Sequence, residues 1–314
     1  MGFYILTYIC MAVFLAAVVW RVWRQLTLPV HVRWEIYPVR HETAERSAYG
    51  GSYMEEPDWW QKPYQTSAVN EFKYMAPEIL LLRGLWKENK RLWRVSFPFH
   101  LGLYLMLATF VLLLLNAVLT LWNPAAFAEG SALRVGLGGL MVACGWIGLA
   151  AGVTGSLGLL YRRLSDYNLN LYATPADYFN IIFILTFFVS GFLTTAFSDP
   201  FFDGARLYVL GLLSGGSVVP AYAPGQGFFG AATIVLGSLL AAYVPLTHMS
   251  HMFMKYFLYH KVKWDDVPSR SGSAVESAVS KNLGYKPTWS ARHVEADGQK
   301  SWRDIASSTP KEMK

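Results

Sequence analysis

The chain has 314 residues, of which 54% are hydrophobic, 16% are aromatic and only 15% are charged. Soluble globular domains carry roughly 25% charged residues, so this composition excludes an ordinary soluble domain. The net charge of +6 is small, and without a basic helix or an aromatic–basic platform nothing indicates nucleic-acid binding. The two cysteines form no CxxC or CxxCH motif, so this chain alone cannot hold an iron–sulfur cluster or attach haem covalently.

Five apolar stretches each have the roughly 20 residues needed to cross a bilayer. The first covers residues 2–20 and lacks the basic start and cleavage site of a signal peptide, so we expect a retained membrane helix over residues 1–23. The other four cover residues 97–121, 133–160, 176–197 and 227–259. The predicted fold class is an all-α integral membrane protein, a five-transmembrane-helix bundle whose last four helices form a core over residues 97–263.

Lysine and arginine are unevenly distributed between these stretches, and this distribution predicts the orientation. The first connection holds twelve of them from Arg21 to Arg94, and the third connection has Arg162 and Arg163. The C-terminal tail begins with three lysines, whereas the other two connections have one basic residue each. By the positive-inside rule we expect the N-terminus outside and the C-terminus in the cytoplasm of a multi-pass protein of the cell inner (cytoplasmic) membrane.

The connection over residues 24–96 is rich in Trp, Tyr and Pro as well as in basic residues. Disordered segments have few aromatics, so we expect a long ordered cytoplasmic loop. Residues 78–90 fit an amphipathic helix on the membrane surface. Two compatible interpretations stay open for this loop: a cap over the bundle, or a docking surface for a soluble partner. The polar, Ser-rich cytoplasmic tail over residues 264–314 is expected to be an extended or partly disordered arm that a partner orders.

Three of the seven histidines, His100, His248 and His251, lie inside predicted membrane helices. The second and fifth helices run in opposite directions, so all three imidazoles fall at similar depth near the cytoplasmic side. An ionisable group at membrane depth is costly and usually has a partner. One imidazole from each of two helices is the geometry that holds one haem b, which predicts His100 and His251 as its axial iron ligands. Bis-imidazole ligation leaves no open iron position and favours electron transfer. The alternative is a hydrogen-bonded, purely structural role.

The role of His248 stays open at this stage. On a continuous helix it would point about 60° away from His251 and lie about 4.5 Å along the axis. It is a candidate for bonding a haem propionate or the backbone, for lining a proton path, or for binding a second haem with a loop histidine such as His31 or His41.

Three runs in this core carry a resemblance: FHLGLYLMLATF, LLYRRLSDYNLNLYATPADYFNIIFIL and PLTHMSHMFMKY. In their order and spacing they resemble the gamma subunit of respiratory nitrate reductase and its relatives. Those relatives are the cytochrome b membrane subunits of heterodisulfide-reductase-like and sulfite-reduction-associated complexes. The long loop, with HVRWEIYPVRHE and GGSYMEEPDWW, is more similar to the relatives that work with a heterodisulfide-reductase-type iron–sulfur subunit.

The resemblance implies a reduced haem content. The nitrate reductase subunit stacks two haems, with two histidines ten residues apart on its second helix and two eighteen apart on its fifth. Carried over, the inner pair falls on His100 and His251, and the outer pair falls on Phe110 and Thr233, which cannot ligate haem iron. One haem b is therefore expected, and a second one stays open. His248 falls where that family has a basic residue, which favours a propionate or surface role.

Because Phe110 and Thr233 stand where the resembled family has its outer haem ligands, three positions stay open for a quinone site. The expected one lies near the inner haem, around the second helix and residues 243–247. The others are a site served by a second haem on His248, and a site outside near Arg134 with another subunit carrying the electrons.

The function expected from these patterns is that of a membrane cytochrome b subunit in an anaerobic respiratory complex. It would transfer electrons between the menaquinone pool and an iron–sulfur subunit on the cytoplasmic face. Such a chain is the electron-transfer subunit of an oxidoreductase complex rather than a complete enzyme, and no catalytic residue is assigned. The rival interpretations are a cofactor-free membrane anchor or scaffold, and a proton-relaying transporter component.

Overall fold

A computed structural model describes residues 2–27, 42–49, 52, 55–63, 65–217, 227–260 and 270–308 of the chain. The chain forms two compact units. The first unit comprises Met1–Val18 and Pro77–Met249, and the second unit comprises Val19–Ala76 and Ser250–Lys314. Helices make up most of both units in their described parts.

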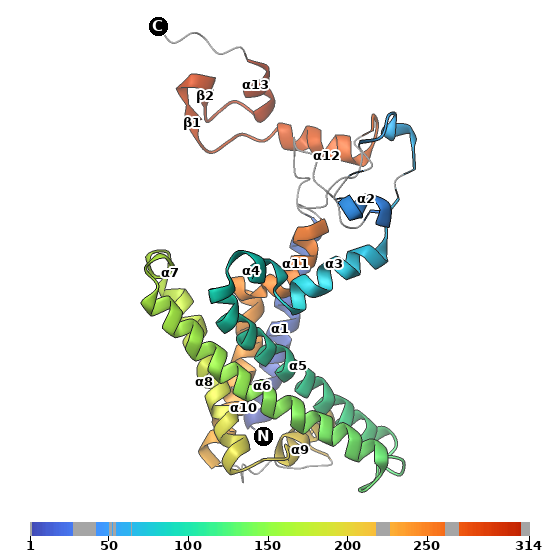
Figure 1. Cartoon of the computed structure of the whole chain (residues 1–314), viewed down its shortest axis with the longest axis vertical. Coiled ribbons are helices and arrows are strands. Elements are labelled where there is room, and N and C mark those ends of the chain that lie inside the picture. The colour runs from blue at the N-terminus through green and yellow to red at the C-terminus, as the bar shows by residue number, and fades with distance from the viewer. Residues whose placement is uncertain are drawn as a thin grey trace. The chain divides into compact units, whose positions relative to one another are not determined.

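Five helices among the described residues are long and apolar enough to cross a membrane, as predicted, which makes the chain a multi-pass membrane protein. Four of them, α5, α6, α8 and α10, pack in chain order, each against the next. A shorter helix, α9, packs against α5 (Figure 1). The bounds are α1 (Gly2–Leu26), α5 (Lys90–Trp122), α6 (Ala132–Ser165), α8 (Pro175–Phe197), α9 (Asp203–Leu213) and α10 (Gly227–Tyr243).

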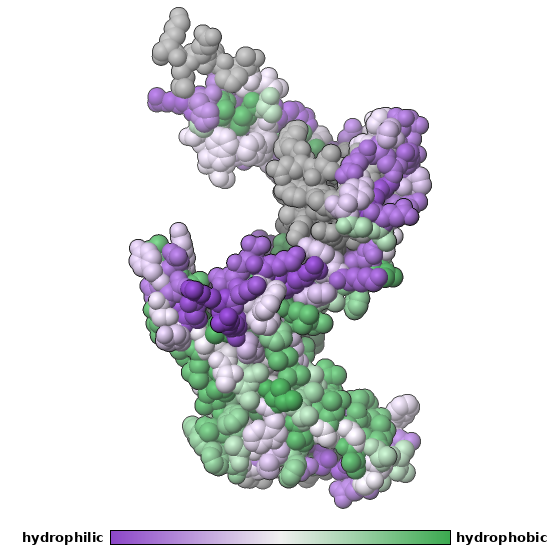
Figure 2. All heavy atoms as spheres, viewed as in Figure 1, coloured by the Kyte–Doolittle hydropathy of each residue, from purple (hydrophilic) through white to green (hydrophobic). Residues whose placement is uncertain are grey.

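The first unit has two distinct ends. One carries α4 (Arg83–Glu88), the start of α5, and α7 (Tyr167–Leu171), which follows α6. The other carries α9 and the start of α1. We refer to them as the α4 end and the α9 end. Hydrophilic side chains gather around the α4 end, whereas the surface of the long helices is mostly apolar (Figure 2).

Short polar side chains define where the long helices begin. Asn89 accepts a hydrogen bond from the backbone N–H of Leu92 at 3.0 Å, at the start of α5. At the start of α8, Asp177 accepts hydrogen bonds from the N–H and the hydroxyl of Thr174 at 2.9 and 2.8 Å. Pro175 occupies the first helical position, where its missing N–H costs nothing. These contacts satisfy N–H groups that a helix start otherwise leaves unpaired.

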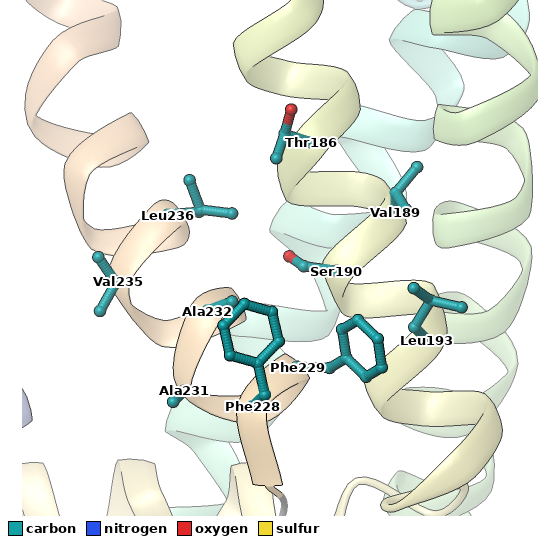
Figure 3. A pocket seen from close by; sticks show the side chains of 10 residues that line it. All are labelled: Thr186, Val189, Ser190, Leu193, Phe228, Phe229, Ala231, Ala232, Val235 and Leu236. Carbon is teal, nitrogen blue, oxygen red and sulfur yellow. The ribbon is translucent and has the colours of Figure 1, made fainter.

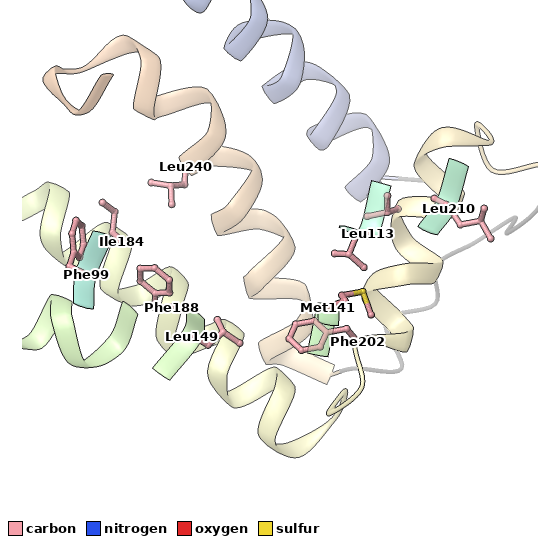
Figure 4. Packing of buried hydrophobic residues seen from close by; sticks show 11 residues of the cluster. Phe99, Leu113, Met141, Leu149, Ile184, Phe188, Phe202, Leu210 and Leu240 are labelled. Carbon is pink, nitrogen blue, oxygen red and sulfur yellow. The ribbon is translucent and has the colours of Figure 1, made fainter. Parts of the chain in front are cut away.

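Glycines let α5 and α6 approach closely. A Cβ placed on Gly102 would lie 2.6 Å from the Cα of Gly152, so neither position has room for a side chain. Small residues at such contacts are typical of membrane helix pairs, whose association relies on close packing. The fully buried ring of Phe188 on α8 covers Gly152. It joins Phe99 and Leu149 in one hydrophobic cluster (Figure 4).

The predicted continuous helix over residues 227–259 is wrong. α10 ends at Tyr243 and is followed by two 3-10 turns, η3 (Val244–Leu246) and η4 (His248–Ser250), before α11 (His251–Leu258) begins. Pro245 has no N–H to donate, and its ring would clash with the carbonyl one turn earlier in a regular α-helix, which kinks or breaks the helix. Thr247 is extended, with φ −112° and ψ 179°. The relation of about 60° expected between His248 and His251 therefore does not apply.

The first connection contains more breaks than predicted. Its described elements are α2 (Ala44–Tyr49), the 3-10 turn η2 (Trp59–Gln61), α3 (Ala68–Leu80) and α4. The single helix expected over residues 78–90 is wrong, because Leu82 has a left-handed backbone with φ 52° between α3 and α4. An L-residue in that conformation ends a right-handed helix. In the second unit, Tyr74 of α3 packs edge-on against Tyr259, with ring centroids 6.0 Å apart.

The tail is folded over residues 270–308, so the expectation of an extended arm is wrong there. The rings of Trp289 and Trp302 lie 5.5 Å apart, and the N–H of Trp302 donates to the carbonyl of Tyr285. Two short strands pair antiparallel, with Ser290 opposite Asp297. The elements are α12 (Ala274–Leu283), β1 (Ser290–Ala291), the 3-10 turn η6 (Arg292–Val294), β2 (Ala296–Asp297) and α13 (Trp302–Ser307).

Candidate functional site

His100 lies on α5, nearly three turns from the start of the helix, and is half-buried. Its Nδ1 atom is 2.7 Å from the backbone carbonyl oxygen of Ser96, one turn earlier. A carbonyl oxygen can only accept, so Nδ1 carries the proton and Nε2 carries the lone pair of the neutral ring. The ring lies edge-on to Phe99 at 5.3 Å. Packing and this hydrogen bond together fix both the orientation and the tautomer of His100.

Tyr104 anchors the next turn of α5. Its hydroxyl donates to the carbonyl of Ile79 at 2.7 Å, and its ring centroid is 6.3 Å from that of His100. The segment before α4 is therefore attached to α5 beside the predicted iron ligand.

His248 lies at the α4 end of the first unit, in a polar network that the sequence did not reveal. Its Nε2 is 3.4 Å from the amide nitrogen of Asn180 and 3.8 Å from a carboxylate oxygen of Asp177. The hydroxyl of Tyr243 donates to the amide oxygen of Asn180 at 2.8 Å, and Arg163 lies 3.2 Å from the second oxygen of Asp177. The His248 side chain is 65% exposed. Its ring nitrogen is thus engaged with protein groups, which fits a surface role better than iron ligation.

His251 is the first residue of α11, is exposed, and belongs to the second unit. His100 belongs to the first unit, so their pairing across one haem stays a prediction. His31 and His41, the loop histidines considered as partners for a second haem, lie outside the described residues. In the second unit, His260 Nε2 lies 3.0 Å from Glu71 Oε1, as expected of a structural histidine.

The surroundings of His100 fit an iron ligand. A metal-binding histidine almost always donates its other ring N–H to a carbonyl or carboxylate, which orients the ring and raises its basicity. The bond from His100 Nδ1 to Ser96 is such a contact, and it makes Nε2 the ring atom whose lone pair could coordinate a metal. Among the described residues, no group of three or more His, Cys, Asp or Glu side chains is arranged to hold a metal ion.

The two positions that carry outer haem ligands in the resembled family, Phe110 and Thr233, line a cavity of about 720 Å³. The cavity extends along α10 from Gly230 to Val244, a rise of about 20 Å. Elements α1, α5, α6, α8 and α9 also contribute lining residues, and most of these are apolar. Among the lining residues, all of them described, there is no histidine, lysine or arginine.

A second pocket, of about 540 Å³, lies between α8 and α10 (Figure 3). Phe228 and Phe229 lie at the start of α10, and Thr186 and Ser190 face them from α8. The Thr233 hydroxyl, 3.3 Å from Ser190 Oγ, lies between this pocket and the larger cavity.

Sequence reasoning missed the network around His248 and the cavity. The cap sequence Thr174–Pro175 and the acid two residues later do mark a helix start, but nothing in them indicates that Asp177 meets a residue 71 positions away. The cavity has no linear signature, because its lining residues come from six separate helices and the connection before α9.

No family model matches this chain, and neither does any curated protein or solved structure.

Proposed function

We propose that this chain is a membrane cytochrome b subunit that transfers electrons between the menaquinone pool and an iron–sulfur subunit of a respiratory redox complex. The observation that carries the proposal is the His100 imidazole, half-buried on a membrane-spanning helix, with its Nδ1–H donating to the Ser96 carbonyl. Metal-ligating histidines almost always make such a bond with the ring nitrogen that does not bind the metal. The resemblance of three sequence runs to cytochrome b membrane subunits supports the same function.

In this proposal His100 and His251 hold one haem b. The haem supplies one-electron transfer without an open iron position for oxygen chemistry. His100 is held in its ligating tautomer by Ser96. His248, beside Asp177 and Asn180, acts at the surface, where it bonds a propionate or stabilises the start of α8.

The distribution of basic residues supports a cytoplasmic location for the α4 end. Arg91, Arg94 and Lys87 lie there, as do Arg162 and Arg163 at the end of α6. At the α9 end, Arg134 and Arg206 lie 3.3 and 3.0 Å from acidic partners, Glu129 and Asp203. The positive-inside rule then orients the N-terminus outside. The iron–sulfur subunit would dock on the cytoplasmic side, on the first connection and the tail.

A reduced-minus-oxidised optical spectrum of the purified full chain tests the proposal. We expect a low-spin b-type band that is lost in His100→Ala and in His251→Ala. His248→Ala is the matched control and should keep the band. Far-UV circular dichroism shows whether each variant is folded. A folded wild-type chain without haem would refute the proposal and favour a cofactor-free anchor or a proton-relaying component.

The haem content of the same preparations gives a second measure. Pyridine haemochrome absorbance divided by protein concentration should correspond to one haem per chain. Two haems per chain would refute the single-haem assignment and would point to a second ligand pair that includes His248.

A further inference from the structure

The larger cavity opens toward the bilayer. Three of its lining side chains, Tyr8, Leu107 and Leu213, also lie on the surface, at 47%, 54% and 45% exposure. Tyr8 belongs to α1 and Leu107 to α5, both membrane-spanning helices. A molecule that enters there comes from the lipid phase. The cavity volume of about 720 Å³ falls within the range of roughly 300–1,000 Å³ that is typical of small-molecule binding sites.

Four of the hydroxyl groups that line the cavity already donate their protons to backbone carbonyls. Thr109, Thr194 and Thr233 each donate at 2.8 Å to the carbonyl one turn earlier in their own helices. Tyr208 donates to the Phe3 carbonyl at 3.0 Å. A hydroxyl oxygen that has donated its proton still has lone pairs with which to accept. The polar part of this lining therefore favours a ligand that donates hydrogen bonds.

Asp199 is the strongest acceptor in the lining. It is 7% exposed, and it is the single charged side chain among the cavity residues that the structure describes. Its two oxygens accept from the N–H groups of Gly204 and Ala205 at 3.2 and 3.1 Å, which caps α9. Each carboxylate oxygen can accept more than one hydrogen bond. A ligand hydroxyl that donates to Asp199 would form a charge-assisted bond, roughly twice as strong as a neutral one.

We infer that this cavity binds the ring of a lipid-soluble quinol, with a ring hydroxyl donating to Asp199 and the apolar chain leaving between α1 and α5. The inference rests on the proposed function, in which such a molecule exchanges electrons with the chain. The oxidised quinone only accepts hydrogen bonds, so the cavity selects the reduced form. A phospholipid would bring a phosphate, and the described residues that line the cavity include no cation to neutralise it.

This location differs from the one expected around residues 243–247. The apolar end of the cavity reaches Val244. Its carboxylate, Asp199, caps the start of α9, and Tyr208 lies on α9. The ring therefore binds at the α9 end, in space lined by Phe110 and Thr233, where the resembled family has its outer haem ligands.

Calorimetric titration of the purified full chain with a short-chain naphthoquinol under anaerobic conditions tests the inference. Ala241→Phe places a ring in the cavity and should weaken quinol binding at least tenfold. Ala232→Phe is the matched control, because it makes the same change on the same helix but in the pocket of Figure 3. It should leave the affinity unchanged. Asp199→Asn keeps an oxygen to cap α9 and should weaken quinol binding about tenfold while leaving oxidised naphthoquinone unaffected.

The outcomes separate this inference from the proposed function. Unchanged quinol affinity in a folded Ala241→Phe chain, or a loss confined to Ala232→Phe, would overturn the cavity assignment. So would a co-purifying phospholipid that Ala241→Phe expels without any change in quinol affinity. Quinol binding in the cavity of a haem-free chain would refute only the proposed function. A haem-loaded chain that binds no naphthoquinol would refute only the quinol site.

Discussion

Thr7 is the residue through which α1 is hydrogen-bonded to two other helices of the first unit. Its hydroxyl oxygen is 2.7 Å from the hydroxyl of Tyr208 on α9 and 2.8 Å from that of Ser238 on α10. Since Tyr208 donates its proton to the Phe3 carbonyl, Thr7 donates to Tyr208 and accepts from Ser238. Thr7→Val removes both bonds and keeps a side chain of nearly the same shape.

The expected loss follows from the two bonds. Side-chain hydrogen bonds between membrane helices contribute about 0.6 kcal/mol on average and about 1.7 kcal/mol at most. Two such bonds give an expected destabilisation of about 1–3 kcal/mol for Thr7→Val. The methyl group that replaces the hydroxyl is well tolerated in lipid, so the lower half of this range is the more specific expectation.

Unfolding of the purified chain by SDS in mixed micelles, followed by far-UV circular dichroism, measures this loss. Thr186→Val is the matched control. The exposed Thr186 donates at 2.8 Å to the Ile182 carbonyl of its own helix, so its replacement should change the stability by less than about 0.5 kcal/mol. If Thr7→Val is as stable as the wild type, the hydroxyl network does not hold α1 and the reasoning fails.

Two further predictions concern packing and pH. Gly152→Leu forces a side chain into the ring of Phe188 and should destabilise the bundle by roughly 1–3 kcal/mol or more. Gly136→Leu, at a position on α6 with nothing within 4 Å, should not destabilise it. Equal melting temperatures of the two variants would contradict the packing of Gly152 against Phe188. In the tail, hydrogen bonds from the Ser301 hydroxyl and N–H hold the pKa of Asp304 below its ordinary value of 3.8. This depressed pKa stabilises α13 above pH 3.8, and the effect is lost as the pH falls through the folded-state value. Hydrogen exchange of α13, corrected for the intrinsic rate, should therefore accelerate in that range. Ser301→Ala should reduce this pH dependence, because only the backbone N–H of residue 301 would still donate to Asp304.

The five spans are a property that the sequence alone determines. A stretch of about 20 apolar residues must cross the bilayer as a helix, because no other local structure satisfies its backbone there. The helix starts are similarly local. Asn89 accepts from the N–H of Leu92, three residues later, and the N–H of Thr174 donates to Asp177, also three residues later. The orientation of the His100 ring on α5 is also set locally, since Ser96, to which the ring donates, lies one turn before it.

Proline shows where local reasoning stops. α5 continues through Pro98 and α3 through Pro77, yet α10 ends two residues before Pro245. The same residue type gives opposite outcomes because neighbouring helices decide whether the freed carbonyl and the bend can be accommodated. The break at Tyr243 in turn determines that His248 lies beside Asp177 instead of continuing a helix toward His251.

Which distant side chains meet depends on how the helices pack. Asn180 joins Tyr243 and His248 across more than sixty residues of sequence. The space beside Phe110 and Thr233, which the sequence marked only by the absence of two imidazoles, is an apolar cavity with a buried carboxylate. Apolar runs specify membrane helices one at a time, because burial in lipid needs no partner. A cavity and a hydrogen-bond network exist only after the helices have packed, since each is lined by residues from several of them.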